Sequence, residues 1–219
     1  MAPRAWCNRG MPGYRALIFD LGGVILPLDY ERGYAAIAPA CGLPVEEIPR
    51  RIAATGLIEP FETGRIGGRE FARRIGEALG LKLTYEEFCK VWSAIFPPET
   101  LIREELFAEL AGLYRLLLLS NTNEIHFEYI RKNYGFVRYF DDFVVSYEVG
   151  AMKPAPEIYR AAIRAAGCAP QECFFTDDVP ENVEAARRHG IDAAVFTSEQ
   201  RLRGELERRG ILLRGASGG

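Results

Sequence analysis

Apolar residues follow two different spacings along the chain. Ala16–Asp20 is a short, continuously apolar run that ends on an aspartate and precedes two glycines, as a buried strand of a parallel sheet does. From Tyr30 to Phe96 the apolar residues recur at helical spacing, with no second strong strand. After Pro98, short apolar runs and helical stretches alternate. Further strands are expected at Tyr114–Leu119, Phe140–Ser146, Cys173–Thr176 and Ala193–Phe196.

This alternation is typical of an α/β fold. We predict a three-layer α/β/α architecture with a doubly wound parallel sheet and a small helical cap inserted after the first strand. Residues 14–28 and 98–212 would form the α/β core, and residues 29–97 the cap. Inside the cap, Thr84 and Glu87 are spaced as a capping box. Residues 1–13 lack the apolar segment of a signal peptide, and we expect a disordered extension there, with Met1 or Met11 as the start.

The composition narrows the class of protein. With 219 residues, of which 48% are hydrophobic, the chain can bury a continuous core. A formal net charge of -3 without long runs of like charge argues against a nucleic-acid partner, and no apolar run is long enough for a membrane span. The five cysteines form no CxxC pair, which favours a reducing compartment and a cytoplasmic location. The sequence leaves the oligomeric state open.

Four polar clusters stand at or just after predicted strand ends: Asp20, Ser120-Asn121, Lys153 and Asp177-Asp178. A doubly wound sheet brings such ends to one edge, where ligands bind. Each cluster alone has an ordinary explanation, as a helix cap or a solvated loop charge, but these explanations would have to hold at all four together. Jointly, the clusters offer a nucleophile, carboxylate ligands for Mg²⁺, a positive charge and donors for phosphate oxygens. Phosphoryl transfer requires this set.

The order and spacing of these clusters resemble the motifs of the haloacid dehalogenase (HAD) superfamily of hydrolases. The likeness covers Ala16 to about Thr197, and the cap lies where this superfamily carries one. In detail the chain is most similar to the subgroup of phosphatases that act on glucose 1-phosphate and to the N-terminal phosphatase domain of soluble epoxide hydrolases. The matching segments are Phe19-Asp20-Leu21-Gly22-Gly23-Val24, Leu118-Leu119-Ser120-Asn121-Thr122-Asn123, Gly150-Ala151-Met152-Lys153-Pro154, and Phe174-Phe175-Thr176-Asp177-Asp178 with Asn182-Val183-Glu184-Ala185-Ala186.

The resemblance implies a role for each cluster. Asp20 would be the nucleophile that forms an aspartyl-phosphate, and Lys153 would hold the charges of the nucleophile and the phosphate. Ser120 and Asn121 would bind the transferring phosphoryl group. The implied substrate is a small phosphorylated molecule, with a sugar phosphate as the suggestion, and the implied cofactor is Mg²⁺. The implied ligands of Mg²⁺ are Asp20, the main-chain carbonyl of Gly22, Asp178 directly, and Asp177 directly or through a water molecule.

One position departs from the family pattern. Phosphatases of this superfamily usually carry a second aspartate two residues after the nucleophile, which protonates the leaving alkoxide and then activates water; here Gly22 stands in its place. Such acid–base help is typically worth about 10²–10⁴-fold. A sugar 1-phosphate would need it less, because a hemiacetal oxygen leaves more easily than a simple alkoxide. Asp29 could replace the missing group or only cap the helix at Tyr30, and His126 could face the pocket.

Three functions stay open at this point, and we predict the first. It is a Mg²⁺-dependent phosphatase that hydrolyses a small phosphomonoester through an aspartyl-phosphate. The second is a metal-independent dehalogenase, because carbon–halogen displacement by an aspartate needs neither a leaving-group acid nor a metal; the paired Asp177-Asp178 speaks against it. The third is a non-catalytic ligand-binding protein that keeps the fold, and the nucleophilic Asp20 speaks against that.

Overall fold

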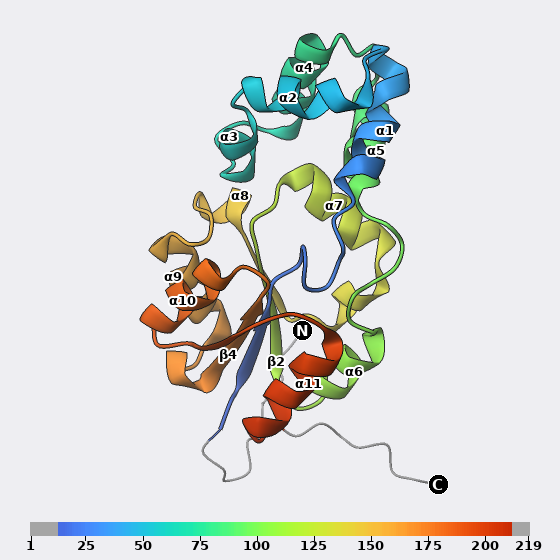
Figure 1. Cartoon of the computed structure of the whole chain (residues 1–219). Helices are drawn as coiled ribbons and strands as arrows, with labels where there is room; N and C mark the ends of the chain where they lie inside the picture. Colours follow the sequence, from blue (N-terminus) through green and yellow to red (C-terminus); the bar gives the residue numbers. More distant parts are fainter. Residues whose placement is uncertain (1–12, 212–219) are drawn as a thin grey trace, which may run out of the picture.

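The predicted parallel sheet is present in the computed structural model, which describes residues 13–211 (Figure 1). Its five strands pair in the order β3-β2-β1-β4-β5, and all neighbouring pairs are parallel. The α/β class is thereby confirmed. The strands are β1 (Ala16–Phe19), β2 (Arg115–Ser120), β3 (Asp142–Val145), β4 (Cys173–Asp177) and β5 (Asp192–Val195). The extension expected at residues 1–13 lies outside the described residues except for Gly13, and so does the choice between Met1 and Met11.

Helices cover both faces of the sheet. They are α6 (Glu104–Ala111), α7 (Glu124–Asn133), α8 (Ser146–Val149), α9 (Pro156–Ala166), α10 (Pro180–Arg188) and α11 (Glu199–Arg208). Successive side chains of a strand point to opposite faces. Leu17 and Phe19 therefore pack into the apolar cluster that includes α6, α7 and α11, whereas Ala16 and Ile18 pack into the one that includes α9 and α10. The result is the predicted three-layer arrangement.

The chain between β1 and α6 forms a further helical layer, here called the helical insertion (residues 30–95), beyond the carboxyl ends of the strands (Figure 1). Its own apolar cluster contains two stacked pairs of rings, Phe61 with Phe71 and Phe88 with Trp92. The predicted capping box is confirmed at the start of α5. The helices are α1 (Tyr30–Cys41), α2 (Ile48–Ala54), α3 (Ile58–Glu62), α4 (Gly68–Leu79) and α5 (Tyr85–Trp92). In the described part of the chain, every helix is too short or too polar to cross a membrane.

Two short helices were missed by the sequence prediction. Helix α3 has five residues and α8 has four, so neither is long enough to show an apolar period. Helix α3, in the insertion, packs against α8, in the core. Gly64, just after α3, has a φ of +68°, and a Cβ atom there would lie 2.1 Å from the carbonyl oxygen of Tyr147 in α8. Only glycine allows both this dihedral and this approach.

The three central strands position the site. Strand β1 lies between β2 and β4 and ends one residue before Asp20. Strand β2 ends on Ser120, and β4 ends on Asp177. Because the strands are parallel, these three polar side chains leave adjacent strands at the same edge of the sheet.

Candidate active site

Lys153 joins two of the predicted carboxylates at this edge. Its Nζ atom lies 2.7 Å from Oδ1 of Asp20 and 2.6 Å from Oδ2 of Asp177, and it donates to the carbonyl oxygen of Leu119 at 3.1 Å. The side chains of Lys153, Asp20 and Asp177 are all buried. The structure therefore brings together three residues that the sequence placed at separate strand ends.

Asn121 holds the segment that carries this lysine. Its Oδ1 atom accepts a hydrogen bond from the main-chain N–H of Lys153 at 2.7 Å, and its Nδ2 atom donates to the carbonyl oxygen of Lys153 at 3.0 Å. The amide side chain is thus engaged with protein at both ends, so it positions Lys153. Its neighbour Ser120 is buried at the end of β2, where its Oγ atom makes a long contact of 3.4 Å with the Asn121 carbonyl oxygen.

The two adjacent aspartates after β4 have different surroundings. Asp177 is fully buried, and its oxygens accept from Lys153, from the Val179 main-chain N–H at 2.8 Å, and from Asn182 Nδ2 at 3.1 and 3.2 Å. Asp178 is exposed and lies over Gly23, where a Cβ atom would be 2.3 Å from its Oδ2 atom. Because Gly23 has no side chain, Asp178 can approach the loop that follows β1.

The cluster carries more negative charge than Lys153 balances. Burial raises the pKa of the Asp20 carboxyl to about 7; Lys153 opposes this rise, and the charge of Asp177 adds to it. Burial disfavours the charged form of Lys153, but the charges of Asp20 and Asp177 raise its pKa overall. Burial and the charge of Asp177 also raise the pKa of Asp178.

A divalent cation would suit this cluster. Asp20, Asp177 and Asp178 each offer one oxygen atom, and these atoms lie within 4.8 Å of one another. An octahedral Mg²⁺ with bonds of about 2.1 Å joins oxygens up to about 4.2 Å apart, so small side-chain movements would complete the site. With all these groups charged, the three carboxylates and the one ammonium leave two negative charges unbalanced, which one such ion would neutralise.

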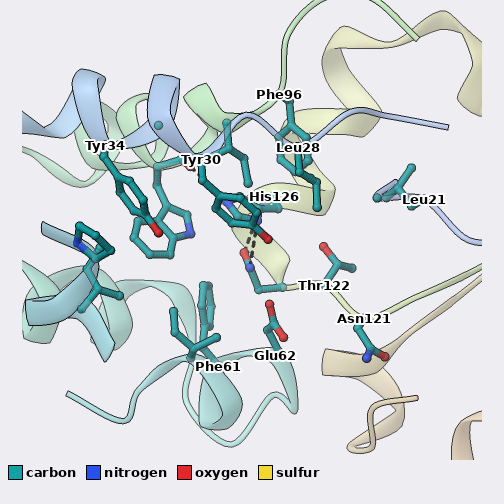
Figure 2. A pocket seen from close by; sticks show the side chains of 18 of the residues that line it. Leu21, Leu28, Tyr30, Tyr34, Phe61, Glu62, Phe96, Asn121, Thr122 and His126 are labelled. Atoms are coloured by element: carbon teal, nitrogen blue, oxygen red, sulfur yellow. Dashed lines mark hydrogen bonds between the residues drawn. The ribbon is translucent and has the colours of Figure 1, made fainter. Parts of the chain in front are cut away.

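A cavity of about 300 Å³ lies between the helical insertion and the sheet edge (Figure 2). This volume is at the lower end of the usual range for small-molecule sites, about 300–1,000 Å³. Leu21, Gly22 and residues 120–123 line it on the core side. On the insertion side, the rings of Tyr30, Tyr34 and Phe61 line it together with the carboxylate of Glu62. The cavity thus reaches the ends of β1 and β2, where Gly22, Ser120 and Asn121 are the predicted site residues that line it.

Two residues considered at the sequence level have structural contacts. Asp29 caps α1, accepting a hydrogen bond from the Arg32 main-chain N–H at 2.9 Å. His126 lines the cavity, but its Nε2 atom contacts the Trp92 carbonyl oxygen and its Nδ1 atom contacts Asn123 Nδ2, both at 3.1 Å. Burial lowers the pKa of His126 to about 4. A neutral ring that donates to Trp92 and accepts from Asn123 satisfies both contacts and ties α5 to α7.

The sequence analysis missed two residues of this site. The sequence identified Gly23 only as part of the first motif, although it makes room for Asp178. Glu62 was not identified for two reasons. It ends a helix of five residues, which is too short to show an apolar period, and the position of that helix over the sheet depends on packing. The only feature of the sequence that could have indicated a role for Glu62 is its place in the insertion.

Fold and site together define an α/β enzyme with an acid–lysine cluster at the carboxyl ends of a parallel sheet and a helical insertion after the first strand. The chain belongs to the family of haloacid dehalogenase-like hydrolases, whose model matches residues 14–190. The superfamily resemblance seen in the motifs is confirmed, and the narrower subgroup stays a prediction.

Two of the relatives that the chain matches are described as phosphatases. The chain is 28% identical over 182 residues to D-ribitol-5-phosphate phosphatase of Bacteroides thetaiotaomicron, an alignment that covers 80% of this chain and 88% of the relative. It is 27% identical over 188 residues to a phosphorylated carbohydrates phosphatase of Thermotoga maritima, covering 81% and 82%. A HAD family enzyme of B. thetaiotaomicron, solved in complex with magnesium and inorganic phosphate, superposes with a TM-score of 0.77 at 31% identity and covers 85% of this chain and 96% of its own.

Proposed function

We propose that this protein is a Mg²⁺-dependent phosphatase that hydrolyses a small phosphomonoester of the sugar or polyol class through an aspartyl-phosphate. The observation that carries the proposal is the contact of Lys153 Nζ with both Asp20 and Asp177, at 2.7 and 2.6 Å. This arrangement fixes a carboxylate nucleophile at a strand end and places a positive charge where a phosphate would bring negative charge. The two phosphatase relatives, which act on ribitol 5-phosphate and on phosphorylated carbohydrates by name, support the reaction and the substrate class.

Each polar residue has one task in this mechanism. Asp20 attacks phosphorus in line with the leaving oxygen, and Lys153 stabilises the charge on Asp20 and on the phosphoryl oxygens. Ser120 Oγ and the main-chain N–H of Asn121 donate to the phosphoryl oxygens, while the Asn121 side chain keeps Lys153 in place. Water then attacks the aspartyl-phosphate, and inorganic phosphate leaves.

Mg²⁺, when bound, would supply further neutralisation of charge on the phosphoryl oxygens. Asp20, the carbonyl of Gly22 and Asp178 would bind it directly. The exposure of Asp178 supports this direct role. The oxygens of Asp177 already accept from Lys153, Val179 and Asn182, which favours contact with the ion through a water molecule. The magnesium complex of the B. thetaiotaomicron enzyme supports the choice of ion.

The cavity favours a neutral leaving group. Among the described residues that line it there is no lysine or arginine, so a second anionic group would find no partner there. Aromatic rings offer flat apolar contact to the carbon chain of a sugar or polyol.

The predicted domain bounds and cellular location are part of this proposal. We keep residues 14–28 and 98–212 as the catalytic core and residues 29–97 as a cap that selects the substrate. The cytoplasmic location rests on the cysteine pattern alone.

A panel of sugar, polyol and nucleoside phosphates and of haloacids, run with Mg²⁺ and with excess EDTA, tests the proposed function. We expect phosphate release that needs Mg²⁺, is fastest with sugar or polyol phosphates, and disappears in Asp20→Asn. Halide release that persists in EDTA would make the protein a dehalogenase. Failure to turn over any phosphomonoester with Mg²⁺ would refute the phosphatase, and failure on the haloacids as well would leave a binding function.

A further inference from the structure

The position of the missing acid is filled by an apolar side chain. A Cβ atom at Gly22 would lie 3.0 Å from Cδ1 of Leu28, so Leu28 occupies the space into which a side chain at position 22 would project. A phosphatase without a carboxylate at position 22 still has to protonate an alkoxide as it leaves, because an unprotonated alkoxide is a poor leaving group. A proton donor must therefore reach the leaving oxygen from elsewhere.

The geometry of in-line attack tells where that donor must lie. Asp20 approaches phosphorus from the end of β1, so the leaving oxygen departs on the opposite side, away from the sheet edge. The helical insertion covers this side, and the cavity beneath it is the space available to the leaving group. A donor on the insertion would thus face the leaving oxygen directly.

Glu62, at the end of α3, provides the one carboxyl group among the described residues that line the cavity. In Figure 2 its carboxylate projects from α3 into the cavity, between Phe61 and Thr122. It makes no hydrogen bond or ion pair within residues 13–211, in contrast to Glu59 on the same helix, which pairs with Arg65. The carboxyl group of Glu62 is therefore available to a ligand.

Tyr30 lies within electrostatic range of both Glu62 and Asp178. Burial raises the pKa of Tyr30, and the charges of Glu62, Tyr34 and Asp178 add to that rise. Both Glu62, from the insertion, and Asp178, from the core, are thus close enough to act on one side chain.

The two other groups that the sequence offered for this task, His126 and Asp29, are less suited to it. Both ring nitrogens of His126 are engaged with Trp92 and Asn123, and its lowered pKa keeps the ring neutral. Asp29 caps α1 and does not line the cavity.

We propose that Glu62 is the general acid and base of the reaction, in place of the carboxylate missing at Gly22. This inference rests on the proposed function. As Asp20 bonds to phosphorus, the bond from phosphorus to the leaving oxygen breaks, and that oxygen takes the proton of Glu62. The Glu62 carboxylate then accepts a proton from the water whose oxygen attacks phosphorus, the bond to Asp20 breaks, and Asp20 returns as a carboxylate.

The ionisation of Glu62 is compatible with both halves of this cycle. Burial raises the pKa of its carboxyl to about 6. At pH 7 roughly a tenth of the free enzyme then holds the proton that the first step needs, and the rest is ready to act as a base.

Glu62→Gln, with Glu59→Gln as the matched control on the exposed side of α3, tests the proposal. The substrates are alkyl phosphates and p-nitrophenyl phosphate, whose leaving group needs no proton. With alkyl phosphates we expect Glu62→Gln to lower kcat by about 10²–10⁴-fold. With p-nitrophenyl phosphate we expect a burst of one nitrophenolate per enzyme followed by slow turnover, because only the second step is impaired. Glu59→Gln should behave as the wild type.

Two results would overturn the role of Glu62 while leaving the phosphatase intact. One is an equal loss on all leaving groups without a burst, which would indicate a purely structural role. The other is a raised KM with unchanged kcat, which would indicate recognition of substrate hydroxyls. Binding of beryllofluoride by Glu62→Gln, measured beside the wild type, verifies that the variant keeps its phosphate site. A wild-type enzyme that turns over none of these substrates would instead refute the proposed function itself.

Discussion

Lys153 is the residue on which the electrostatics of the site depend. Its ammonium group is enclosed by two buried carboxylates, those of Asp20 and Asp177. A buried ion pair adds little net stability over apolar residues of the same volume, but removal of one partner leaves a buried charge uncompensated. The lysine thus allows two carboxylates to lie close together at the ends of the adjacent strands β1 and β4.

Lys153→Met should therefore lower the free energy of unfolding by about 3–5 kcal/mol in EDTA. Mg²⁺ should restore part of this loss, because the ion would balance the carboxylates that the lysine no longer neutralises. Urea denaturation with and without Mg²⁺ measures both effects. Lys132→Met, which removes an exposed pair with Glu128, is the control and should change the free energy by less than about 0.5 kcal/mol. Equal stability of the two variants in EDTA would contradict this account of Lys153.

At the scale of elements, the contact between α3 and α8 holds the part of the insertion that carries Glu62 against the core. Helix α3 ends on Glu62, and two residues later the chain passes against the carbonyl of Tyr147 at Gly64. This close approach depends on a glycine without a side chain. The position of Glu62 over the site is therefore set by a packing contact between two helices of five and four residues.

Gly64→Ala tests this contact, and Gly56→Ala is a matched control. Both glycines have positive φ, +68° and +62°, but an added Cβ atom meets Tyr147 only at Gly64, and nothing lies within 4 Å at Gly56. Both variants should lose roughly 1–2 kcal/mol from backbone strain. Gly64→Ala should also lower kcat/KM by about 10- to 100-fold, because α3 must move. A similar kcat/KM in the two variants would show that the α3–α8 contact does not position the site.

For the whole molecule, the sequence predicted the site residues whose positions follow from the parallel sheet. Parallel strands collect their carboxyl ends at one edge, so Asp20, Ser120 and Asp177 could be grouped although they lie far apart in the chain. The capping box at Thr84 was predictable because it is a local pattern.

The walls of the cavity could not be predicted in the same way. They depend on how the insertion packs over the sheet, and the spacing of residues in the sequence does not indicate that packing. Glu62 and Gly64 acquire their roles only when α3 meets α8, and Gly23 does so only when Asp178 folds over it. The absence of a carboxylate at Gly22 could be predicted, because the first motif usually has an aspartate at that position. Glu62, which is proposed to replace it, lies in a different layer of the fold.

The most direct test of the central claim is to trap the phosphorylated enzyme. The wild type is mixed with Mg²⁺ and a phosphomonoester that it turns over, quenched in acid within milliseconds, and mapped by mass spectrometry of its peptides. The account predicts one phosphoryl group on the peptide that contains Asp20, and none in Asp20→Asn. Turnover that proceeds without a phosphoryl group on that peptide, or that survives in Asp20→Asn, would contradict it.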